Sequence, residues 1–271
     1  NRLEEIMCED ELYGINRLGT IEDINAITKE KLTEAYKKLL KESKVLLSVS
    51  ANGSVETESI KKIFIEYAES TERAPQKGET LYVEKAEDVT YVKETAPVKQ
   101  GKLVMGFRLG MKDRNDDYAA KRIMSDVFGG NPNSKLFKVV REEMSLCYYC
   151  AATSVRYKGF LMVDSGVETE NAQKAIDEIL NQLEIMKKGE FSDFEFNSSV
   201  KSICDSLNTY NDSQRSLDLW YALKINNQNL YSPEDIAQKI KQITKEDVIY
   251  AAKGVKLHTV YKLLPKEGTI C

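Results

Sequence analysis

Apolar residues in the C-terminal part of the chain follow strand spacing in several short runs. The alternation is clearest over Lys102–Leu109, and it recurs in Leu146–Val155 and Phe160–Val167, which are separated by a short glycine-containing turn. Period-two alternation bounded by turn residues is typical of half-buried strands, so the last two runs predict a hairpin. Two weaker runs, Thr80–Val83 and Val89–Lys93, predict edge strands.

Between and after these runs, the apolar residues change to helical spacing. Asp116 and Asp117 fill the first turn of a helix that Gly129–Gly130 ends, and Ser134 is expected to cap the next helix. Two long helices follow the hairpin, and the second is expected to bend or break near Asn208–Asn211. This order of elements predicts an α+β fold with helices on one face of a mostly antiparallel sheet.

A repeated phrase divides the chain. Ile27-Thr28-Lys29-Glu30 recurs as Ile243-Thr244-Lys245-Glu246, and each copy follows a short segment with a hydroxyl N-cap and an acidic first turn. After each copy comes an amphipathic helix and then a predicted strand, Lys44–Ser50 in the first case and Lys256–Leu264 in the second. The alternative is that Thr-Lys-Glu is only a common capping phrase.

A duplication implies one partial and one complete unit of the same kind. We expect residues 1–73 to form the C-terminal part of a first α+β unit, closed by a helix over Val55–Ser70. Residues 74–96, with Pro and Gly among them, are expected to be a linker and entering strands, and residues 97–271 a second, complete unit.

Composition excludes several classes of function. The net charge of −4, with both signs interspersed, disfavours binding to nucleic acid. The apolar runs are of strand length, far short of the roughly 20 residues that span a bilayer, so no membrane role is expected. Five cysteines in 271 residues favour a reducing, cytoplasmic setting. Cys147 and Cys150 form a lone Cys-x-x-Cys inside an apolar run, which favours ordinary buried cysteines over a redox or zinc motif.

The stretch from Gly129 to Tyr148 carries a resemblance to a known family. A glycine-bearing turn is followed by Ser-x-Leu-Phe, an Arg-Glu helix end and a Leu-x-Tyr strand start, and this order resembles the M16 (pitrilysin-like, processing-peptidase-like, inverzincin) peptidases. Tyr13-Gly14 and the following Leu18-Gly19-Thr20 look like the family's passage beyond its metal-binding helices. The resemblance implies a clam-shell of two halves, each made of two M16-like α+β units, with zinc in one half.

In this family the half that faces the zinc contributes an Arg and a Tyr seven residues apart, and Arg141 and Tyr148 match that pair. A guanidinium fork and a phenol are donors that can hold a peptide carbonyl or stabilise a tetrahedral oxyanion. The alternative is that Arg141 pairs with a neighbouring acid such as Glu142 while Tyr148 packs in a core. Gly129, Gly130, Asn131 and Ser134 are candidate substrate-binding residues, because glycine loops let a peptide backbone approach closely. The alternative for this loop is a plain helix-stop turn.

The zinc site of the family needs His-x-x-Glu-His on one helix. The chain has one histidine, His258, on the predicted final strand, where a structural role is expected. We therefore expect no metal and no cofactor in this chain, with zinc on a partner half or in sequence before Asn1.

Three hypotheses about function follow. The first is a metal-free partner that binds peptide, supplies Arg141 and Tyr148 in trans, and pairs with a homologous M16 half or subunit as a homodimer or heterodimer. The second is a fragment of a catalytic M16 endopeptidase whose zinc motif lies further upstream. The third is an inert structural or assembly subunit with the same fold. We prefer the first, in which the chain alone is inactive, because an Arg/Tyr pair is the contribution expected from the half without metal.

Overall fold

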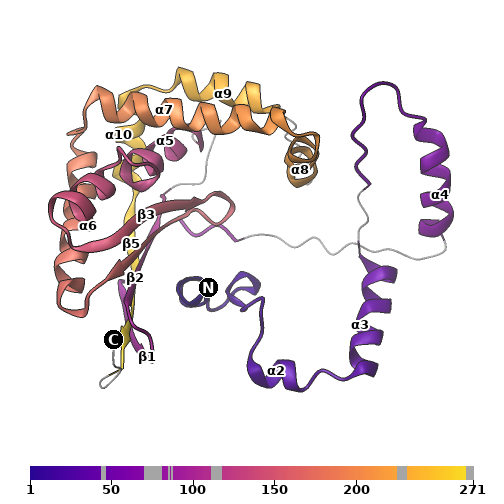
Figure 1. The fold of residues 1–271 in the computed structure, drawn as a ribbon, viewed down its shortest axis with the longest axis horizontal. Helices are drawn as coiled ribbons and strands as arrows, with labels where there is room; N and C mark the ends of the chain where they lie inside the picture. Colours follow the sequence, from indigo (N-terminus) through magenta and orange to yellow (C-terminus); the bar gives the residue numbers. More distant parts are fainter. Residues whose placement is uncertain are drawn as a thin grey trace. The chain divides into compact units, whose positions relative to one another are not determined.

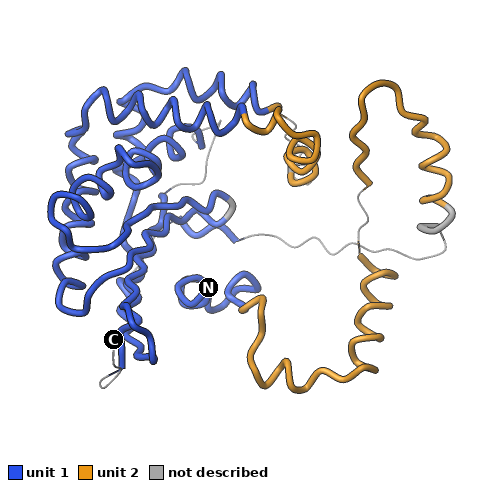
Figure 2. Tube along the Cα trace, in the orientation of Figure 1, with its two compact units in different colours: residues 1–15, 80–208, 233–271 blue, residues 16–79, 209–232 orange. Residues whose placement is uncertain are grey.

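The computed structural model describes residues 1–43, 47–69, 81–84, 86, 88–110, 118–224 and 231–266. The chain divides into two compact units, shown in Figure 2. Unit 1 comprises residues 1–15, 80–208 and 233–271, and unit 2 comprises residues 16–79 and 209–232. The predicted boundaries after residues 73 and 96 stay predictions.

Unit 1 is built on a five-stranded sheet with strand order β1-β5-β2-β4-β3. Neighbouring strands are antiparallel except β1 and β5, which are parallel. The predicted hairpin and the predicted α+β fold with a mostly antiparallel sheet are confirmed. The strands are β1 (Thr90–Ala96), β2 (Gly101–Arg108), β3 (Cys147–Val155), β4 (Phe160–Val167) and β5 (Lys256–Pro265).

A helical layer covers one face of this sheet (Figure 1). The core between the sheet and this layer includes Leu103 and Met105 of β2 and Ile123 and Phe128 of α5 (Tyr118–Gly129), all of which are fully buried. The helices of unit 1 on this face are α5, α6 (Ala172–Lys187), α7 (Asp193–Asn208), α9 (Pro233–Gln242) and α10 (Lys245–Gly254), with the short turns η3 (Arg156–Lys158) and η4 (Thr169–Asn171) at the strand ends. The expected first turn of α5 at Asp116 and Asp117 lies outside the described residues.

The opposite face of the sheet carries the start of the chain. Helix α1 (Arg2–Met7), followed by η1 (Leu12–Gly14), packs its buried Leu3 and Met7 onto β2 and β5. A Cβ at Gly106 would collide with the sulfur of Met7, so glycine permits this close approach.

The predicted edge strand over Thr80–Val83 is wrong at residues 81–83, which form no strand, and Thr80 lies outside the described residues. These residues instead cover the β3–β4 turn. The carbonyl of Leu81 accepts a hydrogen bond of 2.7 Å from Lys158 Nζ, and the Tyr82 ring lies against Gly159. The Leu81 carbonyl therefore binds the Lys158 side chain and not a neighbouring strand.

Unit 2 contains α2 (Ile21–Asn25), α3 (Lys29–Glu42), α4 (Thr57–Glu69), η5 (Thr209–Asp212) and α8 (Gln214–Lys224). Its α3 begins after Thr28 as α10 of unit 1 begins after Thr244, each with the threonine hydroxyl accepting a hydrogen bond from the third helical N–H. The predicted bend after Asn208 is confirmed by η5, which separates α7 from α8.

The strand predicted over Lys44–Ser50 does not form at residues 47–50, and residues 44–46 lie outside the described part. The described residues of unit 2 hold no strand with which it could pair, whereas β5, the equivalent in the second copy, lies between β1 and β2. Leu32, Tyr36 and Leu39 on one side of α3 are correspondingly exposed, at 59% or more.

Candidate functional site

Arg141 lies on η2 (Leu136–Glu143), an eight-residue π-helix that leads into β3. The N–H of Met144 bonds to the carbonyl of Val139 at 2.9 Å, and the N–H of Leu146 to that of Val140 at 3.0 Å. Ser145 adopts a left-handed backbone with φ 50°. These wide turns let the chain pass from helix to strand within three residues, and π-helical segments occur frequently at functional sites.

The sequence predicted that the Ser134 side chain caps this helix, and the structure corrects this. The carbonyl of Ser134 accepts the N–H of Lys138 at 3.0 Å, while its buried Oγ makes no hydrogen bond to the described residues. Lys135 already has a helical backbone, so Ser134 occupies the start of the helix by its carbonyl while its side chain does not cap it.

Tyr148 is the extra residue of a β-bulge. Cys147 pairs with Val167 and Tyr149 pairs with Gly166, so the register of the strand pair shifts at Tyr148. Bulges re-aim side chains and are common beside active sites. Tyr148 is 59% exposed, which rules out the alternative that it packs in a core, and its phenol donates a hydrogen bond of 2.6 Å to Glu168 Oε1.

The guanidinium of Arg141 lies over the Phe137 ring at 4.5 Å, and its Nε is 3.3 Å from Glu142 Oε1. The pairing with Glu142 agrees with the alternative raised from the sequence. The Arg141 side chain is 39% exposed, however, and such exposed pairs contribute only about 0 to 1 kcal/mol. A hydrogen bond from Cys150 is the main cause that lowers the pKa of Cys147, and the nearby charge of Arg141 acts in the same direction. Arg141 is thus near the residue that precedes Tyr148.

The four candidate substrate-binding residues lie mostly within the packing of α5, β3 and α7. A Cβ at Gly129 would lie 2.7 Å from the Cβ of Ala152, and Ser134 is 1% exposed. Asn131 Nδ2 donates to Asp126 Oδ2 at 2.5 Å and to Ser199 Oγ at 2.9 Å, and its Oδ1 accepts the N–H of Asn133 at 2.7 Å.

Of the four, Gly130 is exposed. Burial is the main cause that raises the pKa of Asp126, and the amide of Asn131 opposes this by donating to the carboxylate. These contacts give the loop a packing role and support the helix-stop interpretation. A role in substrate binding for Gly129, Gly130, Asn131 and Ser134 stays a prediction.

A polar network next to the bulge was not found from the sequence. Lys102 Nζ donates to the Tyr149 phenol at 2.8 Å, and that phenol donates to Asp164 Oδ1 at 2.9 Å. The Tyr149 ring covers Gly166, which pairs with both Lys102 and Tyr149. The alternation of polar and apolar residues in β2 and β4 could have predicted this network, because it places Lys102 and Asp164 together on the face opposite the helical layer.

The residues present do not fit the zinc site of the M16 peptidases. His258 is the single histidine of the sequence, and its Nδ1 is 2.7 Å from Thr259 Oγ1. Burial is the main cause that lowers the pKa of His258. Across the described ranges, no group of three or more His, Cys, Asp or Glu side chains is placed to hold a metal ion. We assign no metal-dependent step to residues of this chain.

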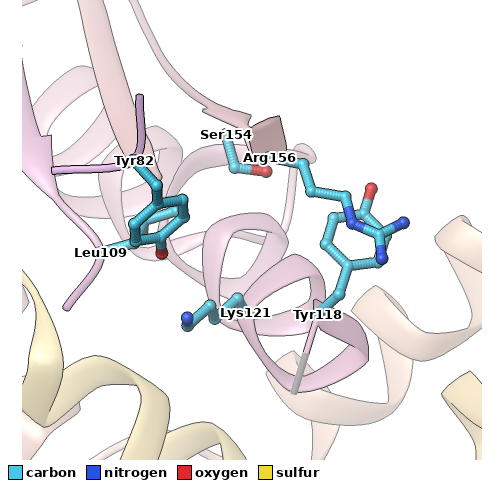
Figure 3. A pocket seen from close by; sticks show the side chains of 6 residues that line it. All are labelled: Tyr82, Leu109, Tyr118, Lys121, Ser154 and Arg156. Carbon is cyan, nitrogen blue, oxygen red and sulfur yellow. The ribbon is translucent and has the colours of Figure 1, made fainter. Parts of the chain in front are cut away.

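A small pocket near the β3–β4 turn is a separate feature (Figure 3). Arg156 stacks on the Tyr118 ring at 4.0 Å, and Lys121 lies on the other side of the opening. None of the predicted site residues lines it. The lining residues are Tyr82, Leu109, Tyr118, Lys121, Ser154 and Arg156.

In the part of the chain that is described, no helix is both long enough and apolar enough to cross a membrane.

Comparison with known proteins decides the family. The Peptidase M16 inactive domain matches residues 26–203. The chain belongs to this M16 family. It is 32% identical over 267 residues to the "Probable inactive metalloprotease YmfF" of Bacillus subtilis, a match that covers 98% of the chain and 62% of YmfF. It is also 26% identical over 201 residues to the "Uncharacterized zinc protease YmxG" of the same organism, covering 72% of the chain and 46% of YmxG.

Solved structures agree on the M16-like fold. A conserved protein from Enterococcus faecalis superposes with a TM-score of 0.86 at 22% identity, covering 97% of the chain and 62% of that protein. The peptidase M16 inactive domain from Pseudomonas fluorescens gives 0.70 at 16% identity, covering 94% and 62%. The chain therefore spans less than two thirds of the length of these relatives.

Proposed function

We propose that this chain is the substrate-binding, non-catalytic half of an M16-type peptidase. In this proposal Arg141 and Tyr148 face a peptide that is held against a zinc site on another half or subunit. The observation that carries the proposal is the bulge at Tyr148, which turns an exposed phenol outward directly after the π-helix that holds Arg141. The match to an inactive M16 domain supports the absence of metal chemistry of its own.

The chemistry of the two side chains suits this role. A guanidinium and a phenol donate hydrogen bonds, and such donors stabilise negative charge that develops on a peptide carbonyl oxygen. Their resting acceptors, Glu142 and Glu168, are both exposed carboxylates. Water can replace an exposed carboxylate at modest cost, so a bound peptide can take over either donor.

The partner in this proposal is a homologous M16 half that carries zinc, because the resemblance to the M16 peptidases implies two halves with zinc in one of them. The chain covers only part of the length of its M16 relatives, which is compatible with a partner of this kind. Cys8, Cys147, Cys150 and Cys204 are free thiols, which supports a reducing compartment such as the cytoplasm.

A second candidate function is an inert assembly subunit. Its supporting observation is that both donors already hold carboxylates within the chain. The third hypothesis, a catalytic fragment, requires a His-x-x-Glu-His motif outside these 271 residues.

The test is co-expression with a zinc-bearing M16 protein of the same genome, followed by cleavage of quenched fluorescent peptides. Arg141→Lys and Tyr148→Phe should each lower kcat/KM by about tenfold or more if they contact the transition state. Tyr250→Phe is the matched control, because Tyr250 is similarly exposed, at 66%, on α10. Full activity in both site variants would favour the assembly subunit.

A further inference from the structure

The Cys-x-x-Cys of β3 has an unusual geometry. In a regular strand, residues three apart point to opposite faces. Here the bulge at Tyr148 inserts one residue, so Cys147 pairs with Val167 and Cys150 pairs with Ser165. Val167 and Ser165 are two residues apart on β4 and share a face. The two thiols are therefore neighbours on the same face of the sheet.

Their surroundings differ in a way that separates their chemistry. Cys147 is partly exposed at the strand start, whereas Cys150 is 4% exposed. The cation of Arg141 lies on the Cys147 side of the pair. Reactive cysteines are found in partly exposed, electropositive surroundings, and buried cysteines without such neighbours are inert.

We propose that Cys147 and Cys150 form a redox-active dithiol that closes into a disulfide across the Tyr148 bulge. Cys147 is the attacking thiol and Cys150 the resolving one. The partner in the reaction is a small-molecule disulfide such as oxidised glutathione. Ordinary buried cysteines were expected from the sequence because both lie inside an apolar run, and the bulge that places them on one face is seen only in the strand pairing.

Titration of the pair supports these roles. The pKa of Cys147 is lowered to about 7, chiefly because Cys150 donates a hydrogen bond to it and also because of the Arg141 charge, against the effect of burial. The same interaction, together with burial, raises the pKa of Cys150. At neutral pH a large share of Cys147 is thiolate, which is the form that attacks a disulfide.

The reaction balances in two exchanges. The Cys147 thiolate attacks one sulfur of the small disulfide, whose sulfur–sulfur bond breaks and releases one thiolate. Cys150 then gives its proton to that thiolate and attacks Cys147 Sγ, which breaks the mixed disulfide and releases the second thiolate, protonated by solvent. Both cysteine thiols are oxidised to one disulfide, and the small disulfide is reduced to two thiols.

The test uses the full chain with oxidised glutathione in excess, followed by intact mass and peptide mapping. The expected product has lost the mass of two hydrogens and carries a Cys147–Cys150 link. Cys150→Ser should instead stop at the glutathione adduct on Cys147, whereas Cys204→Ser, a buried cysteine of α7, should behave as the wild type.

A second probe keeps the test independent of oxidation. Phenylarsine oxide binds two thiols that lie side by side, so the wild type should take up one equivalent at this pair and either single serine variant should lose it. A wild type that keeps a stable glutathione adduct on Cys147, or that forms no link and binds no arsenical at this pair, would overturn the proposal. Because neither readout requires a partner subunit, this outcome is independent of the proposed peptidase role.

Discussion

The phenol of Tyr148 donates a hydrogen bond of 2.6 Å to Glu168 Oε1 and so ties the β3 bulge to the residue that follows β4. Hydrogen bonds to ionised acceptors are short and about twice as strong as neutral ones. The bond holds an exposed phenol in one orientation, and it also makes Glu168 a competitor for any peptide carbonyl that would bind Tyr148.

Removing the Glu168 charge should strengthen peptide binding. Glu168→Gln weakens the resting bond of Tyr148, and we expect the Kd of a labelled peptide to fall by about threefold, since exposed charge-assisted bonds contribute on the order of 1 kcal/mol. Fluorescence anisotropy measures this. Glu170→Gln, an exposed acid two residues later, is the control. An equal gain in a Tyr148→Phe background would show that the phenol is not involved.

The attachment of the chain's first residues should depend on one buried ion pair. Lys158 is fully buried and pairs with Glu11, while its Nζ lies 5.3 Å from the Tyr13 ring centroid. Glu11→Ala leaves a buried ammonium uncompensated, and we expect a loss of about 3 kcal/mol in the free energy of unfolding. Urea titration measures it, with the exposed Glu9→Ala as control. Equal stabilities of the two variants would contradict this account.

The Asn131 side-chain amide should stabilise the fold and not bind peptide. Asn131→Ala leaves the half-buried Asp126 carboxylate and the buried Ser199 hydroxyl without that donor, and we expect a loss of about 2 kcal/mol in unfolding free energy. Asn133→Ala is the matched control, because among the described residues Asn133 takes part in this turn through its backbone N–H, which the substitution keeps. Peptide affinity, measured where both variants are folded, should be unchanged. A weaker affinity without loss of stability would restore the substrate-binding role.

Local pattern predicted the parts of the fold that depend on neighbours in sequence. The hairpin of β3 and β4 was found because alternation and a glycine turn determine it. The contacts of Lys158 were not predicted, because its partners Glu11 and Leu81 are far from it in the sequence. The spacing of Arg141 and Tyr148 was visible, but the bulge that exposes Tyr148 depends on the register of β4, which no single segment encodes.

The pH dependence of the alkylation rate should distinguish Cys147 from Cys150, the two cysteines on either side of the bulge. The thiolate is the reactive form, so a lowered pKa moves the reaction to lower pH: with Cys147 near 7, its rate with iodoacetamide should be half-maximal about one to two pH units below that of an ordinary thiol. Cys150→Ala and Arg141→Gln should each move the Cys147 profile to higher pH, because each removes an interaction that favours the thiolate. Burial raises the pKa of Cys204, so its profile should lie higher still. Mass spectrometry of the labelled peptides measures all three thiols in one sample, and a Cys147 profile that ignores both substitutions would contradict the pairing of the two thiols.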